Sequence, residues 1–282
     1  MLRKLFKYDF LAIGKNMWVF TIIAAGLAAL ACFTFTGIIE LSEFLGTASA
    51  DRETALGISL MMAAVMLFMV CIFGIIAYAV LGMIMILVRY YTNLFTDEGY
   101  LTFTLPVKTS TILNSKILSG ISWYAIIVAV EIISFAAIIT TVMITTGDSS
   151  LWEVSEYYTV EPDTVNILGE IVIGICDTLS LVIILFEPVL LMFLCVTLAS
   201  VIARRARVVL GLGLFFAVNS VTSAVVTAGS VFITYMTTEF FGYNYYADTI
   251  AQSLLYILLY GTILVVSYLL NRYLLKNKLN LA

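Results

Sequence analysis

The stretch "GISLMMAAVMLFMVCIFGIIAYAVLGMIMILV", residues 57–88, decides the fold of this chain. It holds no Asp, Glu, Lys or Arg, and it exceeds the roughly 18 consecutive apolar residues that identify a membrane-spanning helix. Its apolar residues are nearly continuous, whereas a strand of a membrane barrel alternates apolar and polar residues. The stretch therefore predicts an α-helix that crosses a bilayer.

The composition of the whole chain supports the same interpretation. Of its 282 residues, 62% are hydrophobic and only 11% are charged, whereas soluble domains carry about 25% charged residues. No linker divides the chain, so we predict one membrane domain over residues 1–282, an all-α polytopic fold with six transmembrane helices. The expected spans are residues 17–39, 57–88, 117–144, 171–203, 208–237 and 250–270.

Lys and Arg residues fall almost entirely on one side of these expected spans. Only Arg52 lies on the other side. The remaining basic residues are Arg3, Lys4, Lys7, Lys15, Arg89, Lys108, Lys116, Arg204, Arg205, Arg207, Arg272, Lys276 and Lys278. Because the side rich in Lys and Arg stays in the cytoplasm, we expect both termini and the polar passage at 89–116 to be cytoplasmic.

Several kinds of chemistry are excluded by what the sequence lacks. It contains no histidine, so neither a zinc-peptidase motif nor a Ser–His pair can form. Asp177 is the only Asp within an expected span, whereas aspartyl proteolysis needs two. No G-x-x-x-x-G-K-[ST] motif is present to hold ATP phosphates. We therefore expect no enzyme, no metal or cofactor bound by this chain, and no nucleic-acid partner.

One polar passage, "YYTNLFTDEGYLTFTLPVKTSTILNSK" at residues 90–116, separates two of the apolar runs. Asp97 and Glu98 suit the positive end of a short helix, and Pro106 ends that helix. Its aromatic and leucine side chains could lie on the lipid surface or dock into a cytosolic partner. A lipid-facing helix favours basic residues near anionic headgroups, so the two acids favour docking.

The part of this passage at residues 93–118, "NLFTDEGYLTFTLPVKTSTILNSKIL", resembles the cytoplasmic loop of type-2 ABC transporter permeases from Gram-positive bacteria. Six spans, cytoplasmic termini and a basic amphipathic N-terminus also match that family. The resemblance implies that the 89–116 loop holds a coupling helix, which inserts into a separate cytosolic ABC ATPase subunit. Carried over by position, the docking contact falls on Asp97, Glu98, Gly99, Tyr100 and Leu101, with Leu105 and Pro106 shaping the exit.

The same resemblance implies the rest of the assembly. The chain would sit in the bacterial cytoplasmic membrane as a multi-pass permease and pair with a second copy or a homologous permease. ATP and Mg would be bound by the partner ATPase rather than by this chain. In that family the second and fifth spans line the pathway between the two permease subunits.

The N-terminal segment, residues 1–16, has apolar residues at helical spacing on one face and basic residues with Asp9 on the other. This pattern predicts an interfacial amphipathic helix. It could serve as a simple membrane anchor, or it could contact the ATPase as the connecting helix does in the resembled family. Both roles are compatible with the sequence.

Polar residues inside the spans are candidates for a cavity or a pathway. Glu131 and Glu187 lie near the middle of the third and fourth spans, and Pro188 follows the second of these. Each glutamate could line a cavity or a proton path, or it could be protonated and bonded to a neighbouring helix. The fifth span adds four candidates for the pathway: Asn219, Ser220, Ser223 and Thr227.

Taken together, these features predict the permease subunit of an ATP-driven ABC transporter that exports an amphipathic peptide, drug or lipid. Two alternatives stay open. One is a proton-coupled secondary transporter that uses Glu131 and Glu187 as a relay. The other is a non-transporting membrane immunity or assembly protein that only sequesters a peptide.

Overall fold

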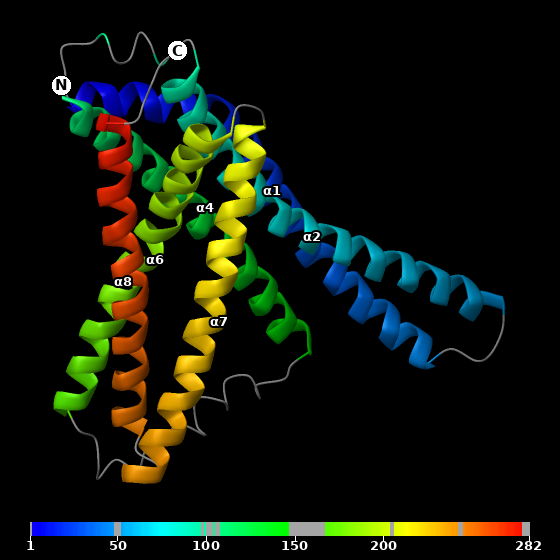
Figure 1. Cartoon of the computed structure of the whole chain (residues 1–282). Helices are drawn as coiled ribbons and strands as arrows, with labels where there is room; N and C mark the ends of the chain where they lie inside the picture. Colours follow the sequence, from blue (N-terminus) through cyan, green and yellow to red (C-terminus); the bar gives the residue numbers. More distant parts are fainter. Residues whose placement is uncertain are drawn as a thin grey trace. The chain divides into compact units, whose positions relative to one another are not determined.

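The structure, a computed structural model, describes residues 2–47, 52–96, 99, 104, 108–146, 167–203, 206–241 and 245–277. These residues form no strand and six long helices (Figure 1): α1 (Leu2–Thr47), α2 (Arg52–Phe95), α4 (Thr109–Thr146), α6 (Ile167–Ile202), α7 (Arg207–Phe241) and α8 (Tyr245–Asn277). All six are long and apolar enough to cross a membrane. The predicted all-α polytopic membrane fold with six spanning helices is therefore confirmed.

The helices extend beyond the apolar runs that predicted them. Helix α1 runs without a break from Leu2 to Thr47, so residues 2–16 of the amphipathic segment and the first apolar run belong to one helix. Helix α2 continues to Phe95 and α4 begins at Thr109, which narrows the connection between them to residues 96–108. Polar residues at these ends keep helical backbone bonds because nothing in the sequence breaks the helix there.

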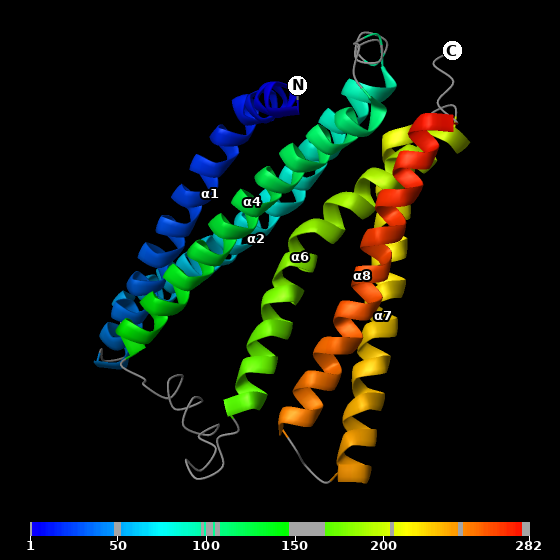
Figure 2. The same cartoon turned by 90° about the vertical axis from the view of Figure 1, so that its left-hand side faces the viewer.

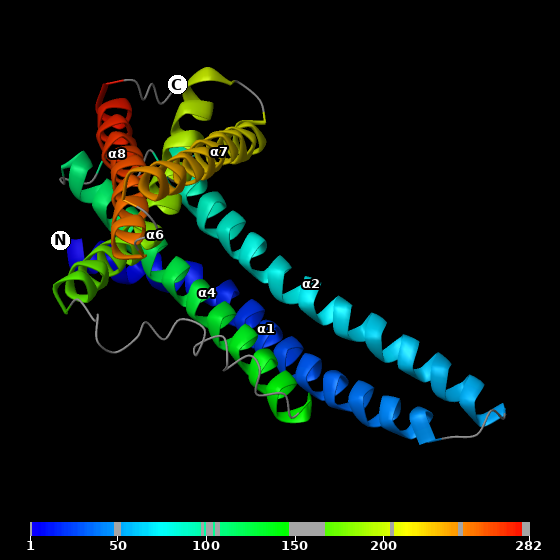
Figure 3. The same ribbon diagram turned by 90° about the horizontal axis from the view of Figure 1, so that it is seen from below.

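The chain divides into two compact units. Unit 2 comprises Ala12–Met85 and Trp123–Val160. In it α1, α2 and α4 lie side by side (Figures 2 and 3) around a core of small and branched side chains. The core residues are Ala28 and Ala31 of α1, Cys71 and Ile75 of α2, and Ile138 of α4. Alanine and cysteine at these positions let the three helices approach closely, as is common in membrane bundles.

Unit 1 comprises Met1–Leu11, Ile86–Ser122 and Glu161–Ala282. Within it α6 packs against both α8 and α7, and α7 also packs against α8 (Figures 1 and 2). Gly211 explains how closely α6 and α7 approach, because a Cβ added there would lie 2.9 Å from Cγ2 and 3.1 Å from Cα of Val196. The close approach of these two helices therefore depends on the missing side chain.

A polar cluster joins the end of α7 to the start of α8. The hydroxyl of Thr237 donates to Oδ1 of Asp248 at 3.0 Å, and Nε2 of Gln252 donates to Oδ2 of the same carboxylate at 2.8 Å. Nε2 of Gln252 also lies 2.9 Å from Oγ1 of Thr234. Asp248 lies in the first turn of α8, where its negative charge also interacts favourably with the positive end of the helix dipole.

Candidate functional site

The connection between α2 and α4, residues 96–108, carries the predicted docking residues. Six of them, Asp97, Glu98, Tyr100, Leu101, Leu105 and Pro106, lie outside the described residues. The seventh, Gly99, is buried, and its N–H donates to the carbonyl of Thr96 at 2.8 Å.

Gly99 makes a close approach to the end of α2. A Cβ added at this position would lie 2.5 Å from the carbonyl oxygen of Leu94 and 2.8 Å from its carbonyl carbon. A backbone atom cannot rotate out of the way as a side chain can, so only glycine fits. The hydroxyl of Thr96 bonds back to the carbonyl of Thr92, and the chain therefore turns tightly as it leaves α2.

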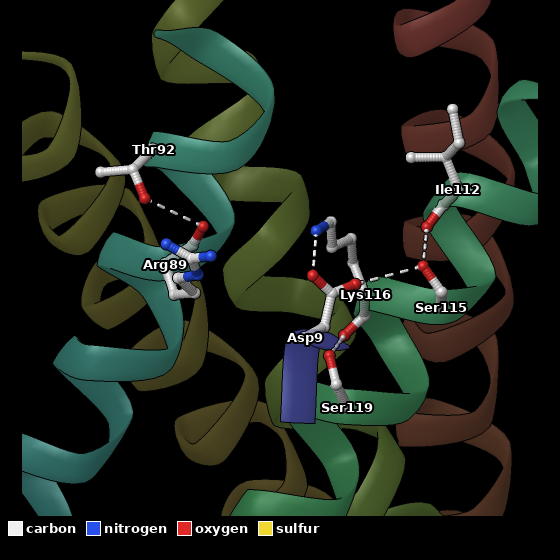
Figure 4. A network of polar contacts seen from close by, with 7 residues as sticks. All are labelled: Asp9, Arg89, Thr92, Ile112, Ser115, Lys116 and Ser119. Carbon is white, nitrogen blue, oxygen red and sulfur yellow. Dashed lines mark hydrogen bonds and ion pairs between the residues drawn. The ribbon is translucent and has the colours of Figure 1, made fainter. Parts of the chain in front are cut away.

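A buried ion pair holds the opposite side of this connection, at the start of α4. Nζ of Lys116 pairs with the carboxylate of Asp9 from the N-terminal segment of α1 (Figure 4), and both side chains are 10% exposed. The hydroxyl of Ser115 lies 3.4 Å from the second carboxylate oxygen of Asp9. The hydroxyl of Ser119 donates to the carbonyl of Lys116 at 3.0 Å. The pair therefore joins the start of the chain to the first two turns of α4.

The end of α2 is held by a chain of hydrogen bonds to α6 and α8. The hydroxyls of Tyr90 and Thr197 lie 3.0 Å apart, and Oγ1 of Thr197 donates to Oδ1 of Asn271 at 2.8 Å. Nδ2 of Asn271 in turn donates to the carbonyl of Leu190 at 3.4 Å. Tyr90, Thr197 and Asn271 are all buried. The single hydroxyl proton of Thr197 is shared between Oδ1 of Asn271 and the carbonyl of Phe193, each 2.8 Å away, so Tyr90 is the donor in the first bond.

Ring stacking reinforces this chain of bonds. The rings of Tyr90 and Phe193 lie 3.9 Å apart between centroids and 6° from parallel. Gly120 of α4 faces the same place, since a Cβ there would meet both Phe193 Cζ and Val189 Cγ1 at 3.0 Å. The end of α2, the start of α4 and the middle of α6 therefore pack closely within unit 1.

Sequence reasoning missed both of these anchors. The sequence places Asp9 on a polar helix face and Lys116 at the end of the polar passage, and it predicts neither side chain to be buried. One signal was available: Asp9 is the only acid among the first 16 residues, which hold four bases. Thr197 and Asn271 gave no comparable signal, because a single threonine is common in an apolar helix and Asn271 precedes an arginine.

Glu187 lies inside unit 1 and is 4% exposed. Its Oε1 has no hydrogen-bond partner among the described residues. The side chain lies near the hydroxyl of Tyr260 from α8. Pro188, which follows it, has no N–H and leaves the carbonyl of Ile184 without its helical donor. A charge at the centre of a spanning helix costs about 2.5–3.5 kcal/mol, so Glu187 is a costly residue to place at this position.

Glu131 lies in unit 2, beside the backbone of Ala79 and near the hydroxyl of Tyr78. Its Oε1 is also buried without a hydrogen-bond partner among the described residues. Tyr78 is bonded to Thr21 at 3.0 Å, and Thr21 also lies 2.9 Å from the carbonyl of Met17. Because Thr21 donates its one hydroxyl proton to that carbonyl, Tyr78 donates its own to Thr21 and has none left for Glu131.

The four polar candidates of the fifth span share one exposed face of α7. They line an open groove of about 930 Å³ whose walls are Phe216, Asn219, Ser220, Ser223, Ala224, Thr227, Ala228 and Val231. The structure therefore brings Asn219, Ser220, Ser223 and Thr227 together, whereas Glu131 belongs to unit 2 and Glu187 to the interior of unit 1.

Neither a metal site in the described residues nor a similar known protein indicates a function for this chain. No group of three His, Cys, Asp or Glu side chains in the described part of the chain could hold a metal ion. Comparison of the sequence and the structure with protein-family models, curated proteins and solved structures gave no match.

Proposed function

We propose that this chain is the membrane-spanning subunit of an ATP-driven exporter, similar to the type-2 ABC permeases, and that it works as a dimer with separate cytosolic ATPase subunits. The observation that carries the proposal is the anchoring of the α2–α4 connection on both sides. Tyr90 ties the helix that enters it to α6 and α8, and Lys116 ties the helix that leaves it to the start of α1.

Anchoring of this kind suits a connection that receives force. A flexible surface loop would move by itself when a cytosolic partner displaces it, because few buried contacts link such a loop to the rest of the protein. Here a displacement of residues 96–108 would pass through Tyr90 into α6 and α8, and through Lys116 into the N-terminal segment. The spanning helices would have an inward-facing and an outward-facing conformation, and ATP binding in the partner would shift the equilibrium between them.

The direction of insertion follows the distribution of Lys and Arg along the sequence. Lys116, Arg89 and Arg272 all lie at the helix ends that the positive-inside rule assigns to the cytoplasm. The α2–α4 connection then faces the ATPase, and the chain resides in the cytoplasmic membrane of a bacterium with both termini inside. The hydroxyl-bearing groove on α7 suits a pathway wall for an amphipathic cargo.

The test is purification of the tagged full-length chain from its native host, with identification of the proteins bound to it. We expect a cytosolic ATPase with a phosphate-binding motif, and we expect the double change Tyr100→Ala and Leu101→Ala to remove it. These side chains are the proposed buried anchors, and loss of such anchors commonly weakens an interface by about 2 kcal/mol or more each. Stimulation of ATP hydrolysis by the permease should be lost together with the ATPase.

A matched control removes an aromatic side chain from the same expected side of the membrane. Tyr273, near the end of α8, is 55% exposed, and Tyr273→Ala should retain the ATPase. If the double alanine variant is folded and keeps both the ATPase and normal transport, the proposed coupling role of the connection is wrong.

A second candidate, a proton-coupled secondary transporter, is favoured by one observation. Glu131 and Glu187 each bury a carboxyl oxygen without a hydrogen-bond partner in the described part of the chain, and such a group can take up and release a proton. This alternative predicts transport into liposomes driven by a pH gradient in the absence of any ATPase. Exporter function instead predicts transport that requires ATP and the partner subunit.

A further inference from the structure

We propose that the groove around Glu131 on α4 is a binding site for lipophilic organic cations, with the Glu131 carboxylate as the counter-ion. The groove belongs entirely to unit 2, and its volume is about 460 Å³. One face of α4 provides all of its lining residues: Val128, Glu131, Ile132, Phe135, Ala136 and Ile139. Glu131 is the single ionisable side chain in this otherwise apolar wall.

Among the described residues, no Lys or Arg forms an ion pair with the carboxylate in this groove. Oε1 of Glu131 is buried and accepts no hydrogen bond from the described residues. The hydroxyl of Tyr78, which lies near Glu131, is already bonded to Thr21. Two ways of neutralising the charge remain, namely a proton or a bound cation. A bound cation is attracted by the negative charge of Glu131. This attraction is stronger where water is excluded than it is in water.

The walls of the groove select the kind of cation. Hard metal cations require about six oxygen ligands, and Glu131 is the only groove residue with an acidic side chain. An organic cation with apolar substituents instead buries them against Val128, Ile132 and Ile139. Phe135 also lines the groove while it packs against the core of unit 2, and an aromatic ring within about 6 Å of a cation attracts it. The groove therefore fits a hydrophobic molecule with one delocalised or shielded positive charge.

The groove belongs to a part of the chain expected to cross the membrane. It lies within the candidate membrane span Thr109–Thr146, and two of its lining residues, Ile132 and Ile139, are exposed within unit 2. A ligand at this depth must therefore be soluble in a bilayer, as a lipophilic cation is. That such a bound cation is the exported cargo rests on the exporter function proposed above, whereas binding itself does not.

Binding to the purified full-length chain in lipid nanodiscs tests the proposal. The probe is radiolabelled methyltriphenylphosphonium, and the matched neutral probe is triphenylphosphine, which has the same three rings without the charge. We expect saturable binding of the cation and only non-saturable partitioning of the neutral compound. Glu131→Gln should weaken cation binding by roughly tenfold or more, because it keeps the shape and removes the counter-ion.

Two further variants separate a binding defect from a folding defect. Glu187→Gln makes the same chemical change inside unit 1 and should leave cation binding unaltered. Ala136→Phe fills the groove but keeps the carboxylate, and it should also weaken binding. Its control, Ile133→Phe, adds a ring at an exposed position that does not line the groove, and it should bind as the natural chain does.

The outcomes also separate this site from the exporter function. Absence of saturable cation binding, or binding that survives both Glu131→Gln and Ala136→Phe, overturns the site even if the chain exports another cargo. Saturable binding that depends on Glu131, together with a chain that recruits no ATPase, supports the site and overturns the exporter function instead.

Discussion

Asp9 and Lys116 stand 107 residues apart in the sequence, and their side chains form an ion pair in the interior of unit 1 (Figure 4). One of them comes from the N-terminal amphipathic segment and the other from the first two turns of α4. The pair therefore gives that segment a fixed attachment to the protein, which a simple membrane anchor does not require.

Removing either partner of this pair should destabilise the protein. Lys116→Met or Asp9→Asn leaves a buried charge without its counter-charge, which costs about 3–5 kcal/mol. The double variant with both changes should recover most of that loss, since no charge is then left behind. Thermal unfolding in detergent measures the effect. Lys7→Met, at an exposed position of the same segment, is the control, and a single variant as stable as this control would show that the pair adds no stability.

The approach of α6 and α7 predicts opposite effects at two nearby glycines. Gly211→Ala places a Cβ 3.1 Å from the Cα of Val196, so the helices must separate, at a cost of about 1–3 kcal/mol. Gly213 has open space around the position of an added Cβ. Gly213→Ala should therefore stabilise α7 by about 0.5–1 kcal/mol, because alanine loses less backbone entropy. Equal melting temperatures for the two variants would contradict the close packing.

Glu187 and Thr197 are two buried polar residues of α6 for which we expect opposite responses to apolar substitution. Glu187→Met removes an oxygen that has no partner among the described residues, so we expect a gain in stability of about 1–3 kcal/mol. Thr197→Val removes the bonds that this hydroxyl makes to the Tyr90 hydroxyl and to Oδ1 of Asn271, so we expect a loss of similar size. Unfolding in denaturant compares them, and a destabilised Glu187→Met would reveal an unrecognised partner.

The orientation of the chain can be tested by labelling with a membrane-impermeant maleimide. In a variant without the four natural cysteines, a single cysteine at Ser149 should react in intact cells. A single cysteine at Ser110, near the start of α4, should react only after the membrane is permeabilised, because we expect that end of α4 to face the cytoplasm. Labelling of Ser110 but not Ser149 in intact cells would reverse the proposed topology.

The six helices were predictable from sequence because each contains a long apolar run. Within a bilayer the backbone N–H and C=O groups of such a run must bond to one another, and a helix does this. Their ends were less predictable. Tyr90 looked like the start of a loop, yet it lies in α2 and is bonded to Thr197. A polar or aromatic residue just beyond an apolar run can either leave the helix or continue it. The partner that decides between these outcomes lies on another helix.

Some relationships among the site residues were likewise predictable from sequence, and others were not. Asn219, Ser220, Ser223 and Thr227 share a groove because helical periodicity places them on one face of α7. The pairing of Asp9 with Lys116 could not be derived, since periodicity within a helix contains no information about contacts between helices. The same limit hid the bond between Thr197 and Asn271.

The hydrogen bonds from Tyr90 also restrict the order in which this protein can be completed during synthesis. Thr197 follows Tyr90 by 107 residues, and Asn271 follows Thr197 by a further 74. At about 5–20 residues per second, α2 waits ~5–20 s for the first partner and a further ~4–15 s for the second. Until then the Tyr90 hydroxyl must be satisfied by water or a temporary neighbour. A nascent chain that stalls before α8 would therefore expose an unfinished polar site, which membrane quality-control proteases could recognise.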